Sequence, residues 1–213
     1  SLYSVMGNSY KIFKESQKNL NMENFNSIFV STTFAKDNSK ISEVLNICKR
    51  AKINNIELGS NHRYQKNFKE IIKKYNFNYI VHNYFPIPKK NFVVNIASSN
   101  KKIRNLSLKH IKKAILFCKA TNSSLYTFHP GFLNDPISAS RSKSNYDFIW
   151  EEKKIKKNYE LAYKQMIVSL NEIVRFAKKQ KVKIAIETEG SYKKRNYLLM
   201  QKPNEYKARF GSG

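Results

Sequence analysis

Short apolar runs alternate with amphipathic stretches along most of this chain, and this alternation restricts its fold more than any other feature. Five runs rich in β-branched and aromatic residues predict strands, at 25–34, 54–61, 78–86, 124–132 and 181–190. Stretches with apolar residues at helical spacing predict helices, at 39–53, 67–76, 101–122, about 150–180 and 202–210. Strands and helices that alternate in this way build a parallel sheet with right-handed crossovers.

Each predicted strand ends in polar or charged residues. These residues are Thr32 and Thr33, Glu57, His82 and Asn83, His129, and Glu187 with Glu189. Polar side chains at the carboxyl ends of parallel strands form the active site of a (β/α)8 TIM barrel. The alternative is an open doubly wound sheet, but no glycine-rich phosphate loop follows the first strand. We therefore expect an α/β fold of the (β/α)8 TIM-barrel type.

The chain contains fewer βα units than a closed barrel needs. Five predicted strands fall short of eight, and a complete barrel usually takes about 250 residues, whereas this chain has 213. We expect residues 1–27 to be a lead segment and residues 28–213 to be a partial barrel domain of about five units. The sequence also starts at Ser1 rather than Met, which suggests trimming or incomplete capture.

Basic residues strongly outnumber acidic ones, with 40 Lys and Arg against 15 Asp and Glu and a net charge of +25. Such a charge attracts anions, either the phosphates of a nucleic acid or a small anionic substrate such as a sugar phosphate. The lysines are spread along the predicted helices, and Lys, Asn and Ile are frequent throughout, as AT-rich coding would also produce. The charge alone therefore leaves a nucleic-acid partner and a compositional origin open.

No apolar run approaches the ~18 to 20 residues of a membrane span, and the N-terminal residues lack the apolar centre of a secretory signal. The two cysteines, Cys48 and Cys118, fall in predicted helices and form no disulfide framework. We expect a cytoplasmic protein without a membrane partner. Its oligomeric state is not defined by these residues.

Three strand ends carry the residue types that bind divalent metals. His82 lies in "VHNYFP", His129 in "FHPGF" and Glu187 in "AIETEG". Because equivalent ends of parallel strands meet at one edge of the sheet, we expect the three side chains to point into the same bowl. Imidazole nitrogens and a carboxylate suit Zn²⁺, Mn²⁺ or Co²⁺. A single strand-end histidine is more often a packed polar residue, so the metal prediction depends on all three.

The residues after His129 predict how its side chain is held. Pro130 biases His129 toward extended backbone, and Gly131 allows the chain to turn sharply away. We therefore expect the imidazole to stay at the rim of the strand.

Taken in order, "VHNYFPIP", "TFHPGF" and "IAIETEG" resemble the xylose isomerase-like TIM barrels, with modest support from "IELG". This superfamily includes sugar-phosphate isomerases and epimerases and endonuclease IV, the abasic-site nuclease. The resemblance covers about residues 28–210 and the first five of eight strands. Family ligands on strands six to eight have no counterpart in this sequence.

The resemblance implies roles for four residues. Glu187 and His129 would be catalytic, both would bind the metal together with His82, and His82 and Glu57 would contact the substrate. Asn83 and Tyr84, which follow His82, are predicted as further substrate contacts. Tyr84 could form an apolar wall over a sugar or could plug the barrel mouth. The implied cofactor is a divalent metal ion, Mn²⁺, Zn²⁺, Co²⁺ or Mg²⁺.

Two activities fit these residues. The first is a metal-dependent sugar or sugar-phosphate isomerase or epimerase, which moves a proton next to a carbonyl through an enediolate-like state. Its partner would be a small neutral or anionic sugar, and the Pro-bracketed loop "NYFPIPKKNFVVNIAS" favours it. The alternative is an endonuclease IV-like zinc phosphodiesterase acting on abasic DNA, favoured by the charge and the histidine pair. A non-catalytic relative is the third reading.

Other polar residues have simpler interpretations. His62 is expected in an exposed loop, and His110, mid-helix between lysines, is expected at the surface. Glu189 is expected at the solvated start of a loop.

Overall fold

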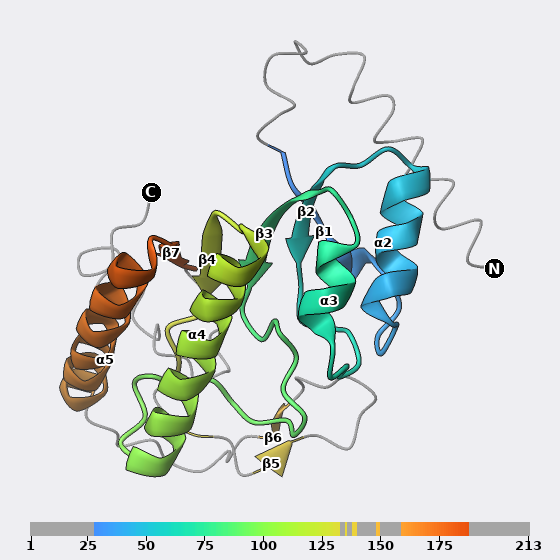
Figure 1. The fold of residues 1–213 in the computed structure, drawn as a ribbon. Coiled ribbons are helices and arrows are strands. Elements are labelled where there is room, and N and C mark those ends of the chain that lie inside the picture. Colours follow the sequence, from blue (N-terminus) through green and yellow to red (C-terminus); the bar gives the residue numbers. More distant parts are fainter. Residues whose placement is uncertain (1–27, 133–134, 136–137, 140–147, 150–158, 188–213) are drawn as a thin grey trace, which may run out of the picture.

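The computed structural model describes residues 28–132, 135, 138–139, 148–149 and 159–187. In this part of the chain five parallel strands form one sheet in the order β1-β2-β3-β4-β7. The strands are β1 (Val30–Ser31), β2 (Asn55–Leu58), β3 (Asn78–His82), β4 (Leu125–Phe128) and β7 (Lys183–Ile186). The helices are α2 (Ile41–Arg50), α3 (Phe68–Lys73), α4 (Lys101–Thr121) and α5 (Tyr159–Gln180). Strands and helices both follow chain order across the molecule (Figure 1).

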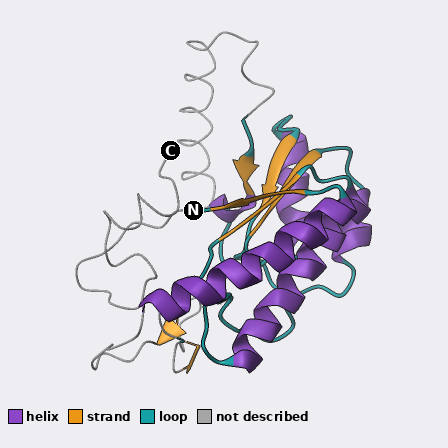
Figure 2. Ribbon diagram, turned by 90° about the vertical axis from the view of Figure 1, so that its left-hand side faces the viewer, coloured by secondary structure: helices purple, strands orange, loops and turns teal. Residues whose placement is uncertain are grey.

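The four helices cover one face of this sheet (Figure 2). A doubly wound sheet would carry helices on both faces, whereas successive helices on one face are the arrangement of a barrel wall. The structure therefore confirms an α/β fold of the TIM-barrel type, with five parallel strands in the described residues. None of the described helices is both long and apolar enough to cross a membrane.

The core lies between the sheet and the helices. Strands β2 and β4 alternate buried and half-buried residues, so one side chain in two points into this core. The buried strand residues are Ile56, Leu58, Tyr79, Val81, Tyr126 and Phe128. Because side chains alternate along a strand, the residues between them point to the opposite face, away from the helices. That inner face carries the polar strand ends.

Helices α2, α4 and α5 end in the same way before the chain enters the next strand. A residue in the left-handed conformation follows each helix: Lys52 (φ 58°), Asn122 (φ 54°) and Lys181 (φ 58°). The next residue then donates its N–H to a carbonyl five positions back, as Ile53 does to Cys48 at 3.0 Å. This is the Schellman motif, which satisfies carbonyls that the helix end leaves open.

The observed elements differ from the predicted ones at two places. Strand β1 is only two residues long, because the chain turns into a short 3₁₀ helix, η2 (Thr32–Phe34). Within the expected long loop, β5 (Ser138–Ala139) and β6 (Phe148–Ile149) form an antiparallel pair that the sequence did not predict. The predicted lead segment 1–27, the start of the helix predicted at 150–180, Glu189 and the helix predicted at 202–210 lie outside the described residues.

Two histidine predictions are wrong. His62 is fully buried, and its Nε2 lies 2.8 Å from Thr32 Oγ1. His110 is only 6% exposed and packs against the rings of Tyr84 and Phe92. Lysines flank His110 in sequence, but positions adjacent in sequence point to different sides of a helix. Its own side of α4 lies under the loop between β3 and α4.

Candidate metal centre

Parallel pairing of β3, β4 and β7 brings the predicted metal residues together. His82, at the end of β3, lies opposite Thr127 on β4, and Thr127 lies opposite Ala185 on β7. Beyond β7, the Glu187 N–H donates to the Phe128 carbonyl at 3.0 Å and so extends the pairing by one residue. The alternation of side chains places His82, Thr127 and Glu187 on the inner face of the sheet.

His82, His129 and Glu187 form a compact trio. One candidate ligand atom from each residue lies within 4.8 Å of the others. Glu187 sits between the imidazoles, with Oε1 3.2 Å from His82 Nδ1 and Oε2 3.6 Å from His129 Nε2. The centroids of the His82 and His129 rings are 5.6 Å apart, and the ring planes meet edge to face at 81°. Two imidazole nitrogens and a carboxylate oxygen are therefore close enough together to hold one metal ion.

Thr127 is a fourth member of this site that the sequence interpretation missed. Its Oγ1 lies 2.8 Å from His82 Nδ1 and 3.5 Å from Glu187 Oε1. A hydroxyl in this place can orient both the imidazole and the carboxylate. Strand alternation could have found it, because Thr127 lies two residues before His129 and on the same face of the strand.

The electrostatic environment keeps His82 available as a ligand. Burial lowers the pKa of His82, the carboxylates of Glu187 and Glu57 oppose this shift, and His129 adds to it. The imidazole is therefore neutral near pH 7, the form that binds a metal. Glu187 is the most exposed of the trio, at 42% of its side chain against 16% for His82 and 23% for His129. The carboxylate thus faces the accessible side of the site.

The backbone turn after His129 has the predicted form. Gly131 has a φ of +126°, which residues with a side chain rarely adopt. The chain turns away directly after the histidine, and the imidazole stays beside the end of β4.

Asn83, a predicted substrate contact, follows His82 in the left-handed conformation, with φ 47°. Its N–H donates to the Thr127 carbonyl at 2.7 Å, and its carbonyl accepts from the Tyr126 hydroxyl at 2.7 Å. The buried Asn83 Oδ1 has no hydrogen-bond partner among the described residues. This acceptor belongs to the residue that follows His82, and a water or a ligand hydroxyl would satisfy it.

Two other predicted contacts are placed differently. Glu57 lies half-buried on the inner face of β2. Its carboxylate is close enough to His82 to oppose in part the lowering of the His82 pKa by burial. Tyr84 is only 5% exposed, and its hydroxyl accepts the Val94 N–H at 2.9 Å. Because Tyr84 packs inside the loop between β3 and α4, its predicted contact with a substrate gains no support from the structure.

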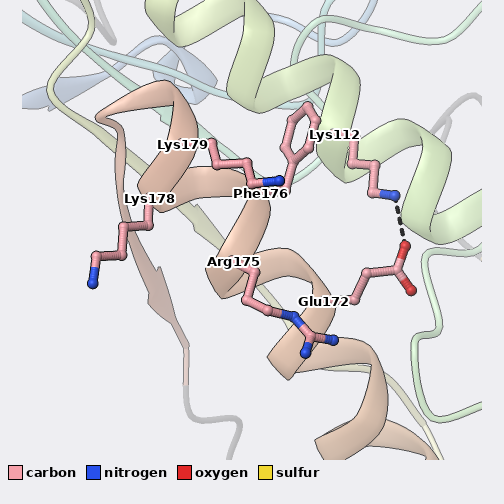
Figure 3. A pocket seen from close by; sticks show the side chains of 6 residues that line it. All are labelled: Lys112, Glu172, Arg175, Phe176, Lys178 and Lys179. Carbon is pink, nitrogen blue, oxygen red and sulfur yellow. Dashed lines mark hydrogen bonds and ion pairs between the residues drawn. The ribbon is translucent and has the colours of Figure 1, made fainter.

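Two grooves lie away from the trio. One of about 610 Å³ is at the end of the sheet where the strands begin, and its lining includes Asn55, Asn78 and Ser124. The other, of about 530 Å³, lies between α4 and α5. It is lined by Lys112, Glu172, Arg175, Phe176, Lys178 and Lys179 (Figure 3). The Lys112–Glu172 ion pair (2.6 Å) spans this second groove, which belongs to the outer helix layer.

The sequence itself shows the family. Residues 45–198, well over half of the 213-residue chain, match the profile described as xylose isomerase-like TIM barrel. The chain belongs to the xylose isomerase-like TIM barrel family. Its sequence matches no curated protein.

Solved structures share the fold of this xylose isomerase-like chain. A D-tagatose 3-epimerase-like protein is 20% identical with a TM-score of 0.52, over 78% of this chain and 54% of that one. An L-ribulose 3-epimerase is 12% identical with a TM-score of 0.53, over 80% and 52%. A D-psicose 3-epimerase in the presence of D-fructose is 9% identical with a TM-score of 0.52, over 79% and 54%. The match spans about half the length of these structures, and at such identities it shows the fold alone.

The donor set of this xylose isomerase-like chain fits a catalytic divalent metal. Two imidazoles and one carboxylate are ligands that Zn²⁺, Mn²⁺ and Co²⁺ accept. Catalytic zinc sites commonly use three protein ligands and leave a position open for water or substrate. Thr127 Oγ1 lies within hydrogen-bond distance of His82 Nδ1 and Glu187 Oε1, as a group that orients metal ligands would.

Proposed function

We propose that this chain forms part of a metal-dependent sugar or sugar-phosphate isomerase or epimerase. The observation that carries the proposal is the convergence of His82, His129 and Glu187 within 4.8 Å at the carboxyl ends of three parallel strands. The end of a TIM-barrel sheet where strands finish is where enzymes of this fold perform chemistry. The solved structures of similar fold include an L-ribulose 3-epimerase, a D-psicose 3-epimerase and a D-tagatose 3-epimerase-like protein, which supports a sugar substrate.

In this proposal His82, His129 and Glu187 hold a divalent ion, Mn²⁺, Zn²⁺, Co²⁺ or Mg²⁺. The bound ion supplies Lewis-acid polarisation of a sugar carbonyl, which acidifies the adjacent C–H. Glu187 is the group that can accept or return the proton, because a carboxylate that binds an ion through one oxygen keeps its second oxygen as a base. His129 would take part in catalysis as a ligand that helps to hold the ion. The neutral state of His82 means that it needs to lose no proton before it binds the metal.

Substrate binding is assigned to polar groups beside the trio. Asn83 Oδ1 is a buried acceptor for a sugar hydroxyl, and His82 and Glu57 line the inner face of neighbouring strands. Tyr84 would contribute indirectly, because its hydroxyl accepts the Val94 N–H and so holds the loop that follows His82. We further propose a cytoplasmic location, which agrees with the two buried free cysteines, Cys48 and Cys118.

Metal titration tests the proposal directly. Calorimetric titration with Mn²⁺ or Zn²⁺ should show one site in the wild-type chain and binding weakened by at least about tenfold in Glu187→Gln. Glu172→Gln is the matched control, because it makes the same change on the outer helix layer, where Glu172 pairs with Lys112. Equal binding by all three proteins would contradict the assignment of Glu187 as a ligand.

A proton-transfer assay then tests the chemistry. The metal-loaded chain is incubated in D₂O with ketoses and their phosphates, and deuterium entry at the carbon next to the carbonyl is followed by NMR. We expect exchange that disappears in Glu187→Gln. Exchange that persists at the wild-type rate in this variant would show that the trio does not carry the reaction.

A zinc phosphodiesterase is the second candidate, and one observation favours it. Helix α4 carries seven Lys and Arg residues and no acidic residue, and cations of this kind attract the phosphates of DNA. The test is incision of a duplex with one abasic site in the presence of Zn²⁺. Robust cutting that Glu187→Gln abolishes would replace the isomerase proposal.

A further inference from the structure

The buried side chain of Asn95 joins the loops that follow β3 and β4. Asn95 lies in the loop between β3 and α4 and is fully buried. Its Oδ1 accepts the N–H of Ala97 at 3.1 Å from its own loop and the N–H of Phe132 at 3.0 Å from the other loop. Its Nδ2 donates to Asp135 Oδ1 at 2.9 Å. One amide therefore bonds the loop after His129 at two places.

The turn after His129 is also in direct contact with Asn95. A Cβ added to Gly131 would overlap Asn95 Oδ1 and would lie 3.2 Å from Asn95 Cα. With its positive φ, Gly131 therefore allows the backbone of the turn to rest on the asparagine amide. The turn and Asn95 fit each other through hydrogen bonds and through shape.

Asn95 is itself anchored to the scaffold. Its backbone N–H donates to Ser107 Oγ at 2.9 Å, and the Ser107 hydroxyl donates to the Ile103 carbonyl of α4 at 2.9 Å. On the far side of the contact, Asp135 Oδ2 accepts the Ser98 hydroxyl at 2.7 Å. The clamp, formed by Asn95 and Asp135, thus connects the turn after β4 to the rigid helix α4.

We propose that Asn95 is a positioning residue of the metal centre, which fixes the imidazole of His129 against Glu187 by holding the turn from His129 to Phe132. His129 needs such a positioning residue because of its place in the backbone. His82 is the last residue of a paired strand, and Glu187 makes a strand-like bond to β4. His129 lies one residue beyond β4, so its placement depends on the turn that follows it. This inference rests on the proposed function, because it assumes that the trio binds a metal.

Exchanging the two side chains of the clamp gives a sharp test. Asn95→Asp places two carboxylates in contact and removes the Nδ2 donor. In the double variant Asn95→Asp with Asp135→Asn, the amide now at position 135 would donate to the carboxylate now at position 95 and would still accept from Ser98. The carboxylate at position 95 would still accept both backbone N–H groups, so every hydrogen bond of the clamp has a counterpart. The double variant should therefore recover what Asn95→Asp alone loses.

The readouts are the affinity for Co²⁺ and the visible absorption spectrum at saturating Co²⁺, which reports the geometry around the ion. We expect Asn95→Asp to bind Co²⁺ about 10- to 100-fold more weakly, as for other groups that orient ligands, with an altered spectrum. The double variant should return to within a few-fold of wild-type affinity, with the wild-type spectrum.

Asn61→Asp is the matched control for a merely structural role. Asn61 also joins two loops, through Nδ2 bonds to the carbonyls of Thr33 (3.2 Å) and Ala35 (2.8 Å), at the β1 side of the sheet. This variant should lose stability and keep the wild-type Co²⁺ spectrum. An Asn95→Asp protein that behaves like this control would overturn the proposal.

The remaining outcomes separate the inference from the proposed function. Wild-type protein that binds no Co²⁺ would contradict the metal centre itself. Wild-type protein that binds Co²⁺, together with Asn95→Asp of equal affinity and spectrum, would overturn only the positioning role. If Asn95→Asp does not fold, Gly131→Ala replaces it, because the added methyl group displaces the turn from Asn95. An unchanged Co²⁺ spectrum in Gly131→Ala would then overturn the proposal.

Discussion

At the scale of single residues, the hydroxyl of Thr127 offers a way to separate metal affinity from folding. Thr127→Val keeps the shape and the strand preference but removes the group 2.8 Å from His82 Nδ1. We expect the affinity for Zn²⁺ to fall about tenfold or more, with a loss of stability of no more than about 1.5 kcal/mol. Calorimetric titration and urea unfolding measure the two effects. Thr33→Val, at an exposed threonine, is the control, and equal Zn²⁺ affinity in both variants would exclude an orienting role for Thr127.

Another residue-scale prediction concerns pH and the buried His62. Burial lowers the pKa of His62 from 6.5 to about 4, so the folded protein keeps this imidazole neutral where the unfolded chain is protonated. As the pH falls from about 6.5 to about 4, folding stability should therefore decrease by up to about 1.4 kcal/mol per unit from this group. Above about pH 6.5 His62 does not lower the folding stability, and below about pH 4 the loss of stability caused by His62 no longer increases.

Urea unfolding at pH 7.5, 6 and 5 tests this dependence. His62→Gln should flatten the pH profile relative to the wild-type chain. His110, whose burial lowers its pKa to about 4, contributes a slope of the same sign in both proteins. The difference between the two profiles isolates His62, and identical slopes would contradict the prediction.

At the scale of elements, two helix ends carry a lysine where glycine would be more stable. Lys52 and Lys181 hold a φ of 58° after α2 and α5. The left-handed conformation costs a residue with a side chain about 1–2 kcal/mol. Replacement by glycine removes this cost, but the larger conformational entropy of glycine in the unfolded chain offsets part of the gain in stability. Lys181→Gly should therefore raise the free energy of unfolding by about 0.5 to 1 kcal/mol.

The matched control is the same substitution inside a helix. Lys49→Gly, in the last turn of α2, should lower stability by about 1 kcal/mol, because glycine is a poor helix former. Urea unfolding of the two variants should give shifts of opposite sign. Shifts of the same sign would mean that the left-handed position is not strained for lysine.

At the scale of the whole molecule, the charge makes its own prediction. Helix α4 carries seven Lys and Arg residues and no acidic residue, and the whole chain has a net charge of +25. We therefore expect the protein to bind any polyanion, because its cations displace counterions from the polyanion. Filter or anisotropy assays should show DNA affinity that falls steeply between 50 and 200 mM salt, roughly the range over which such contacts weaken. Intact and abasic duplexes should bind equally. A marked preference for the abasic duplex would support the nuclease.

The fold class and the convergence of His82, His129 and Glu187 could be predicted from the sequence, because both depend on local patterns. Short apolar runs indicate strands, and apolar residues at helical spacing indicate helices. Polar residues at the carboxyl ends of neighbouring parallel strands lie close together. His110 could not be placed, because its burial depends on a loop that packs over α4 rather than on its charged neighbours. Asn95 could not be predicted either, because nothing near it in sequence shows that it bonds the backbone of Phe132.

The parallel pairing that assembles the trio also has a kinetic consequence. A parallel pair of strands cannot form as a local hairpin and requires a crossover segment to close first, which makes such contacts slow to form. His82, Thr127 and Glu187 meet only after two such crossovers, through α4 and α5, have closed. Helical structure should therefore return early when the chain refolds, and metal-binding capacity should return only when the sheet is complete.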